Sequence, residues 1–275
     1  MKKISISSRN AEYQIIQSLK MNRVKRKKAN EVFVEGIESI KQAINARMEF
    51  TRIIFSDIDR LSNWARNLIN KNTHSRIIDM SYDLYRNLCD RDELSEILAT
   101  VKIVPLKLQD LVYQDKPFVL IFDRPSDCGN LGSIIRSANS FGVDAIFVIG
   151  HAIDIYDPKV IRSSLGSVFH SKIVPIQSIN ELEKWIKIQK DVNNISVVGT
   201  DSTGDVSLLH RSLHKPIALI LGNEAKGMSV ALKAMCDMII SVPISGAVNS
   251  LNVSCAGSIF LWEIYKNSCS NQGAL

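Results

Sequence analysis

The sequence predicts an α/β protein with two domains, and three observations support this. Short, nearly continuous apolar runs such as 117–123 (PFVLIFD) alternate with stretches of helical periodicity, the pattern of parallel strands covered on both faces. The 275 residues suffice for one large domain or two modest ones. The apolar fraction of 45% and the charged fraction of 23% are those of an ordinary soluble globular protein.

The first 105 residues are predicted to form a small α/β domain, because apolar periodicity changes repeatedly between that of helices and that of strands. The expected elements are a helix at 12–20, a strand that enters a helix at Gly36 over 33–46, a strand at 51–57, a helix at 61–72, a strand at 75–81, a helix at 81–92 and a strand at 97–104. A connector at 106–116 follows.

Residues 117–275 are predicted to form a second domain with a parallel sheet, since its strands are continuous apolar runs separated by helices. The expected strands are 117–123, 144–150, 171–176, 195–201, 216–224 and 238–244, with helices at 129–142, 157–169 and 179–190 and an apolar helix after 252.

A ligand site is expected where the parallel strands of this second domain end. Four loops rich in Gly, Asn and Ser follow these strands: 123–130, 199–203, 222–227 and 243–252. None of them carries the GxxxxGK[ST] or GxGxxG pattern of phosphate-binding loops, so nucleotide hydrolysis is disfavoured. The loop 243–252 is also more polar than a helix start requires, because one cap explains only Asn249 or Ser250.

The net charge of +6 is concentrated in residues 1–50, which contain eleven Lys or Arg and five Glu. The densest stretch is RVKRKK, with Arg23, Lys25, Arg26, Lys27 and Lys28. It is either a solvated basic turn or a surface that contacts phosphates, and charge alone does not decide between them.

Cysteines, histidines and hydropathy narrow the class of protein further. The five cysteines are scattered and odd in number, and neither they nor the five histidines show metal-ligand spacing, so no metal is expected. No apolar run reaches the roughly 18–20 residues of a membrane helix, and the N-terminus lacks the apolar region of a secretory signal. A cytoplasmic protein is therefore expected.

Three segments resemble, in order, the signature motifs of the SpoU (TrmH) family of RNA 2′-O-ribose methyltransferases. They are NLGSIIRS (130–137), ILGNEAKGM (220–228) and VPISGAVNSLNVSCAGSI (242–259). The N-terminal domain, with its FVEGIES segment, is similar to the ribosomal-protein-like RNA-binding domain of many members. The resemblance implies a deep trefoil knot in the C-terminal domain, although chains rarely thread through themselves. It also implies a homodimer with shared active sites, and S-adenosylmethionine as methyl donor.

The resemblance assigns roles residue by residue. Arg136 matches the arginine that activates the ribose 2′-hydroxyl, Asn130 the asparagine that positions it, and Glu224 the glutamate of the second motif. Ser250 and Asn252 match polar residues at the reaction centre. From the residues alone, an ordinary arginine on the helix surface is the better interpretation of Arg136. Since an arginine is a poor base, we expect Arg136 to orient and polarise the hydroxyl, with a phosphate or Glu224 as proton relay.

The same resemblance implies which residues surround the donor and the RNA. The donor is expected to contact, largely through backbone, the residues Gly199, Thr200, Leu221, Gly222, Gly227, Val242, Ile244 and Leu251. Arg162 is a candidate for holding a phosphate of the target, with a surface arginine as the equal alternative.

The resemblance gives the reaction but leaves the RNA open. The separate N-terminal domain and its basic stretch favour 23S ribosomal RNA over tRNA, with antibiotic resistance as an alternative to a housekeeping role. Two competing classes are a non-catalytic assembly factor and a knotted enzyme that methylates a base nitrogen. The intact set of Asn130, Arg136 and Glu224 disfavours the first. The second normally carries a catalytic carboxylate where this chain has an arginine.

Overall fold

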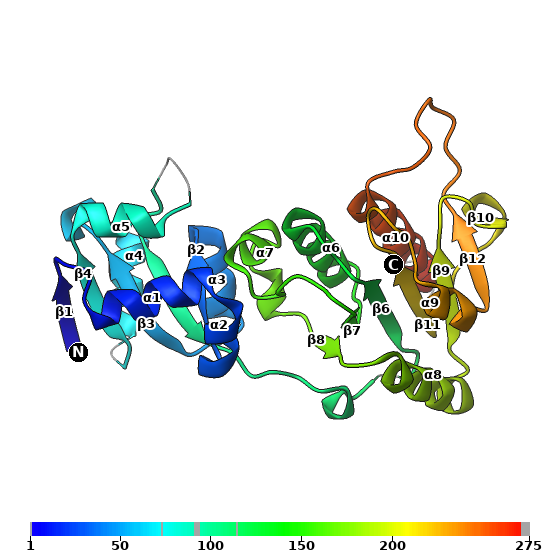
Figure 1. Cartoon of the computed structure of the whole chain (residues 1–275), viewed down its shortest axis with the longest axis horizontal. Helices are drawn as coiled ribbons and strands as arrows, with labels where there is room; N and C mark the ends of the chain where they lie inside the picture. The colour runs from blue at the N-terminus through cyan, green and yellow to red at the C-terminus, as the bar shows by residue number, and fades with distance from the viewer. Residues whose placement is uncertain (1, 73, 91–93, 114, 271–275) are drawn as a thin grey trace. The chain divides into compact units, whose positions relative to one another are not determined.

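The structure is a computed structural model that describes residues 2–72, 74–90, 94–113 and 115–270 (Figure 1). It divides into two compact units. The first comprises Met1–Pro105 and Asp154–His170, and the second Leu106–Ile153 and Ser171–Leu275. The predicted boundaries place 106–116 in a linker and 154–170 in the second domain, so the compact units differ from them at both places.

The first unit is built on a five-stranded sheet of order β1-β4-β3-β5-β2, in which β5 runs antiparallel to both of its neighbours. Its elements are β1 (Lys2–Ile6), α1 (Ala11–Met21), α2 (Arg23–Ala29), β2 (Glu31–Glu35), α3 (Ile37–Asn45), β3 (Phe50–Phe55), α4 (Asn63–Lys71), β4 (Arg76–Met80), α5 (Tyr82–Leu88), β5 (Leu98–Lys102) and α7 (Pro158–Ser163). Strand β1 was not predicted from the sequence, and part of the helix expected at 81–92 lies outside the described residues.

Helix α1 shows how the sequence builds the core of this unit. Its N-cap Asn10 accepts a hydrogen bond from the Tyr13 backbone N–H through Oδ1 at 3.0 Å, which satisfies one donor of the first turn. Tyr13, Ile16 and Leu19 then recur at helical spacing and are all buried. They pack into one apolar cluster with residues of β2, β3 and β4.

Segment 154–170 follows β7 along the chain but folds with the first unit. The sequence predicts one helix over 157–169, and this is wrong beyond Ser163, where α7 ends. The cause is backbone conformation, because Leu165 and Gly166 have φ of 49° and 80°. A Cβ on Gly166 would lie 3.0 Å from the Ser39 Cα, so glycine also permits close packing on α3.

The second unit is built on a seven-stranded parallel sheet of order β10-β12-β9-β11-β6-β7-β8. Its elements are β6 (Phe118–Asp123), α6 (Cys128–Ser140), β7 (Ala145–Ile149), β8 (Ile173–Ile176), α8 (Ile179–Asn193), β9 (Ser196–Thr200), β10 (Val206–Ser207), β11 (Ile217–Leu221), α9 (Val230–Met235), β12 (Met238–Ser241) and α10 (Val253–Ser270). The predicted parallel sheet is confirmed.

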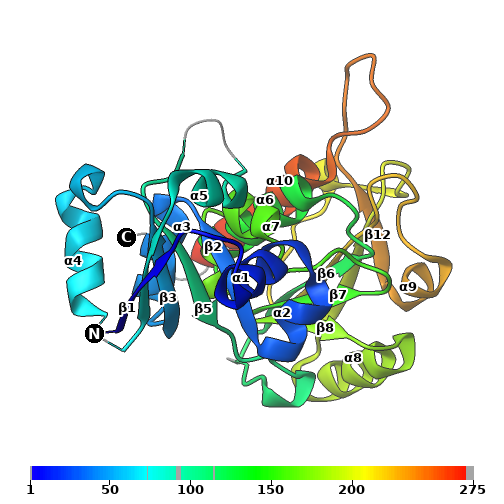
Figure 2. The same ribbon diagram turned by 60° about the vertical axis from the view of Figure 1, so that its left-hand side comes forward.

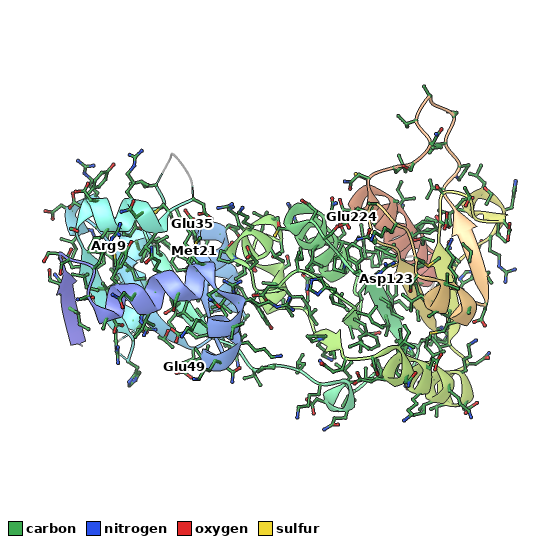
Figure 3. The ribbon with its side chains drawn as sticks, in the orientation of Figure 1. Arg9, Met21, Glu35, Glu49, Asp123 and Glu224 are labelled. Carbon is green, nitrogen blue, oxygen red and sulfur yellow. The ribbon has the colours of Figure 1, made fainter. Side chains whose placement is uncertain are left out.

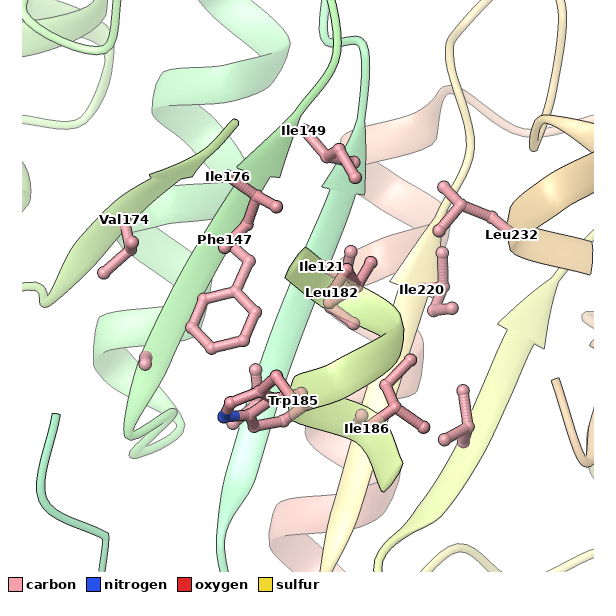
Figure 4. Close-up of a cluster of buried hydrophobic side chains, with 14 of the residues drawn as sticks. Ile121, Phe147, Ile149, Val174, Ile176, Leu182, Trp185, Ile186, Ile220 and Leu232 are labelled. Atoms are coloured by element: carbon pink, nitrogen blue, oxygen red, sulfur yellow. The ribbon is translucent and has the colours of Figure 1, made fainter. Parts of the chain in front are cut away.

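One face of this sheet is covered by α8, whose Leu182, Trp185 and Ile186 lie on the strands (Figure 4). The Trp185 ring meets the Phe147 ring edge-on, with 4.8 Å between centroids. Such an arrangement adds to the stabilisation from apolar burial. The aliphatic side chains of β6, β7 and β11 complete the cluster, which holds the sheet rigid beneath its loops.

Helices α6 and α10 pack against each other. A Cβ on Gly257 would lie 2.5 Å from the Ile134 Cδ1 and 2.8 Å from the Leu221 Cδ1, so this glycine permits the close packing of α10. Between β12 and α10, residues 242–252 form a long loop that projects from the second unit, orange in Figures 1 and 2. The loop and the start of α10 together carry the third predicted motif.

Candidate functional site

A cavity of about 380 Å³ lies in the second unit, at the carboxyl ends of β9, β11 and β12. This is where a parallel sheet is expected to bind ligands. The lining residues come from the loops after these strands and from the first turns of α10: Thr200, Asp201, Ser202, Gly222, Asn223, Glu224, Ala225, Lys226, Gly227, Val242, Ile244, Ser250, Leu251, Val253, Ala256 and Phe260.

Most of the residues predicted to surround a donor line this cavity: Thr200, Gly222, Gly227, Val242, Ile244 and Leu251. Gly199 and Leu221 are not among the lining residues. Each of them is a buried strand position directly before a residue that lines the cavity. The loops predicted to form the pocket therefore converge. Gly199 and Leu221, which were expected to contact the donor, are buried in the strands next to the cavity lining.

Three predicted catalytic side chains form one hydrogen-bonded group beside the cavity. Asn252 Nδ2 donates to Asn130 Oδ1 at 2.9 Å, and Asn130 Nδ2 donates to Glu224 Oε1 at 3.5 Å. The three residues come from the first turn of α6, the loop after β11 and the start of α10. Ser250 lines the cavity beside them. The fold thus brings all three sequence motifs together.

Glu224, labelled in Figure 3, lies in the loop after β11, and hydrogen bonds join its carboxylate to the segment that leads into α6. Its oxygens accept hydrogen bonds from the Ser126 hydroxyl at 2.7 Å, the Ser126 N–H at 3.2 Å and the Asp127 N–H at 3.3 Å. Asp127 in turn caps α6, since its Oδ1 accepts from the Asn130 N–H at 2.8 Å. Asn130 is thereby held by both its backbone and its side chain.

The cap of α10 is Asn252, which corrects the expectation that Asn249 or Ser250 serves as the cap. The Asn252 Oδ1 accepts from the Ser254 N–H at 2.9 Å and from the Cys255 N–H at 3.4 Å. Because Oδ1 is used by the helix, Nδ2 is left to bind Asn130. One side chain therefore serves both as helix cap and as part of the site.

Several lining residues were missed by sequence reasoning. Ala256 and Phe260 follow Asn252 at spacings of four residues on α10, so helical periodicity after the cap was a usable signal. Asp201 is held by Lys233, with 2.7 Å between Nζ and Oδ2. Hydrogen bonds from Lys233 and Thr203 keep the pKa of Asp201 below its usual value despite burial. Asp201 therefore places a negatively charged carboxylate in the cavity lining at neutral pH.

Arg136 lies apart from the hydrogen-bonded group. It is exposed on α6, and in the described part of the chain its guanidinium has no recorded hydrogen bond or ion pair. It is also absent from the cavity lining. Arg162 is ion-paired within the first unit, 3.4 Å from Glu35 and 3.6 Å from Asp90. Within the second unit, Arg136 is therefore not placed in the cavity of its own chain.

The basic stretch RVKRKK forms helix α2, and the structure corrects the prediction for one of its residues. Arg23, Lys25, Lys27 and Lys28 are exposed, but Arg26 is buried. The Arg26 guanidinium lies 2.7 Å from Asp154 and donates to the carbonyl oxygens of Leu19 and Lys20. Arg26 therefore has a structural role and is unsuited to contact a phosphate.

The cavity has the size of a small-molecule site. Its volume lies within the roughly 300–1,000 Å³ of such sites, and its lining combines apolar residues with polar and charged ones. A Cβ on Gly222 would lie 2.5 Å from the Gly227 carbonyl carbon and from the Met228 nitrogen. Only glycine permits this close approach, which leaves backbone polar atoms at the wall. Among the described residues no cluster of three metal-ligating side chains occurs.

No helix among the residues placed in the structure is long and apolar enough to cross a membrane.

Comparison with known proteins identifies two matching family descriptions. The SpoU rRNA Methylase family matches residues 117–262, and the SpoU L30e-like domain matches residues 10–99. A 23S rRNA (uridine(2479)-2′-O)-methyltransferase of Streptomyces viridochromogenes is 35% identical over 271 residues, 98% of this chain and 94% of the relative.

A second relative and a solved structure match the same family of methyltransferases. A 23S rRNA (guanosine-2′-O-)-methyltransferase of Pectobacterium atrosepticum is 33% identical over 160 residues, 58% of this chain and 63% of the relative. The crystal structure of the SpoU methyltransferase AviRb from Streptomyces viridochromogenes, in complex with AdoMet, superposes with a TM-score of 0.87 at 35% identity, covering 94% of this chain and 98% of that one.

Proposed function

The chain belongs to the SpoU family of rRNA methylases, and we propose that it transfers the methyl group of S-adenosylmethionine to a ribose 2′-hydroxyl of 23S ribosomal RNA. The observation that carries the proposal is the hydrogen-bonded group of Asn130, Glu224 and Asn252 beside the cavity. Asn130 lies 94 positions before Glu224 and 122 positions before Asn252, yet the three residues meet where a small-molecule donor fits.

The donor supplies an electrophilic methyl group when it is bound. The apolar side chains of Val242, Ile244 and Leu251 and the backbone around Gly222 and Gly227 would hold it. In the transfer, an oxygen–carbon bond forms at the 2′-position, the sulfur–methyl bond breaks and the hydroxyl loses its proton. The protein therefore has to orient the hydroxyl in line with the methyl group and to assist the loss of the proton.

The catalytic residues divide into positioning and activating groups. Asn130 orients the ribose, and Asn252 fixes the Asn130 amide because its Nδ2 donates to the Asn130 Oδ1. Glu224 accepts hydrogen bonds from Ser126, Asp127 and Asn130, and these bonds favour a positioning role over proton transfer. Ser250, on the cavity wall, is available to the ribose or the donor. Arg136 polarises the hydroxyl, and a phosphate of the RNA receives the proton.

Ribosomal RNA is the favoured substrate. The two relatives described above are named for 23S rRNA, and the family description of residues 10–99 is an L30e-like domain. The exposed cations of α2 add a surface suited to phosphates, namely Arg23, Lys25, Lys27 and Lys28. Arg162 is a less direct candidate for RNA contact, because Glu35 and Asp90 already neutralise it.

Methyl transfer from isotopically labelled donor tests the activity and its substrate together. The protein is incubated with naked large-subunit rRNA or total tRNA, and the product is digested with nuclease and mapped by mass spectrometry. We expect label in rRNA, on ribose, at a position that resists alkaline cleavage because its 2′-oxygen is blocked. Label in tRNA identifies the tRNA enzyme, and label on a base overturns the 2′-O assignment. Donor binding without transfer supports the assembly factor.

Drug susceptibility of a host that expresses the protein separates a resistance role from a housekeeping role.

We further propose that the protein is a cytoplasmic homodimer, and that residues 242–270 take part in the trefoil knot typical of the family. An exposed apolar stripe on α10 supports the dimer: Ile259, Trp262 and Tyr265 are 39%, 50% and 38% exposed. These three residues follow helical spacing on one face. A second copy of the chain is the occupant that buries such a stripe and brings a second Arg136 to the site.

Replacing Trp262 with glutamate is expected to convert the dimer to a monomer and to remove methyl transfer, because a charge would have to be buried at the interface. Light scattering and the transfer assay measure the two effects. The control is Ile188→Glu, since Ile188 is equally exposed on α8 but lies outside the stripe. A W262E protein that stays dimeric contradicts the proposed interface.

A further inference from the structure

An ion pair between the buried Asp123 and the half-buried Arg124, with no role in the reaction above, lies at the end of β6. Asp123 is 2% exposed, and its two carboxylate oxygens accept hydrogen bonds from Arg124 Nε and Nη2, each at 2.8 Å. The carboxylate also accepts the Ser229 N–H at 2.8 Å, directly before α9. Hydrogen bonding to Asp123 raises the pKa of Arg124 above its ordinary value. A bidentate pair of this kind fixes the guanidinium in position and orientation.

The backbone of Arg124 is adapted to this pair. Its φ of 49° lies in the left-handed region, which residues with a side chain rarely adopt. Its N–H donates to the Ile149 carbonyl oxygen at 2.9 Å. A Cβ on Gly150 would lie only 2.6 Å from the Arg124 Cγ, so glycine leaves the room that the side chain needs. The contacts with Ile149 and Gly150 at the end of β7 therefore support the position in which Arg124 pairs with Asp123.

The guanidinium reaches the wall of the donor cavity. Arg124 Nη2 donates to the Gly227 carbonyl oxygen at 3.1 Å, and the Arg124 carbonyl oxygen accepts from Asn223 Nδ2 at 2.7 Å. Gly227 and Asn223 both line the cavity and are paired to each other through their backbones. Thus one residue binds both ends of the turn 223–227, which carries Glu224.

We propose that Arg124, held by Asp123, is a positioning residue for the methyl donor. The guanidinium sets the orientation of the Gly227 peptide group and so keeps the cavity in its binding shape before the donor arrives. Without this contact the turn 223–227 has to be ordered during binding, which weakens affinity. The bound complex then has the same geometry, so the transfer step itself is little changed. The inference rests on the proposed donor site.

The test compares Arg124→Lys with the unaltered protein. Lysine keeps the positive charge beside Asp123, but its single ammonium cannot make the bidentate pair and also reach Gly227. Titration calorimetry with S-adenosylmethionine is expected to give about tenfold weaker binding, as is usual for loss of a charged hydrogen bond. The kcat at saturating donor should stay within about twofold, because binding changes and transfer does not. Asp123→Asn, which keeps the shape but removes the charge, should weaken binding in the same direction.

Lys190→Gln is the matched control, because it removes an ion pair with Asp237 beside the opposite end of β9. It should leave donor affinity unchanged. If Arg124→Lys lowers the melting temperature or the folded fraction while the remaining protein binds the donor normally, Arg124 is merely structural and the inference is wrong. The inference is equally wrong if kcat falls and affinity does not. Failure of the unaltered protein to bind the donor refutes instead the proposed function, and with it the donor site.

Discussion

Replacing Arg136 with alanine is expected to slow methyl transfer by about 10²–10³-fold, the usual loss when one group that stabilises developing charge is removed. Arg136 is exposed and has no recorded side-chain partner within the described residues. The substitution should therefore leave the melting temperature and the affinity for S-adenosylmethionine unchanged. Transfer assays and calorimetry measure the two quantities. Ser140→Ala, one turn further along the exposed side of α6, is the control and should retain activity. Lost donor affinity in the Arg136 variant would refute the assigned role.

The position of Arg136 outside the cavity of its own chain leads to a sharper form of this experiment. In a homodimer, Arg136 of one chain can serve the cavity of the other. A second inactive variant is Ala256→Phe, which places a ring in the cavity because Ala256 lines it. Mixing the two inactive proteins and allowing subunits to exchange should restore about a quarter of the activity, since half of the dimers are mixed and each has one complete site. No recovery would mean that Arg136 acts within its own chain.

Replacing Arg26 with alanine is expected to lower the free energy of unfolding by about 3–5 kcal/mol, the usual cost of breaking a buried ion pair from one side. The variant leaves Asp154, whose side chain is largely buried, without its guanidinium partner. It also removes two hydrogen bonds to the carbonyl oxygens of Leu19 and Lys20 at the end of α1. Urea denaturation measures the loss.

The neighbouring Lys25 provides the contrast, because it is exposed on the same helix. Lys25→Ala should leave the free energy of unfolding within about 0.5 kcal/mol, as for most surface substitutions. Its effect should appear in RNA binding, as weaker affinity and a salt dependence reduced by about one unit of slope. If both substitutions weaken RNA binding equally and neither affects stability, the distinction between buried and exposed cations of α2 is wrong.

The contrast between Arg26 and Lys25 also separates what the sequence predicts of α2 from what it does not. Five cations in six residues identify a basic surface, but only the helical geometry shows that Arg26 alone points inward. The parallel sheet was predictable, because buried parallel strands require continuous apolar runs such as that of β6. The end of α7 was not predictable, because the residue type of Leu165 does not indicate a left-handed backbone conformation.

The candidate site was likewise predictable in part. Loops after parallel strands meet at one edge of the sheet, so the meeting of Asn130, Glu224 and Asn252 followed from topology and motif order. The cap function of Asn252 and the lining by Ala256 and Phe260 depend on the residue at which α10 begins, which periodicity leaves uncertain by several positions. The contact from Arg124 to Gly227 depends on a backbone conformation and carries no pattern in the sequence.

Segment 154–170 limits how this protein can be recombined with relatives. It lies within the stretch that matches the SpoU rRNA Methylase family, but its Asp154 and Asp157 hold Arg26 of the first unit. A chimaera joined at a single point between 105 and 117 would take Arg26 from one parent and both of its carboxylate partners from the other. Exchange of RNA specificity between relatives therefore requires that residues 1–105 and 154–170 be transplanted as one module.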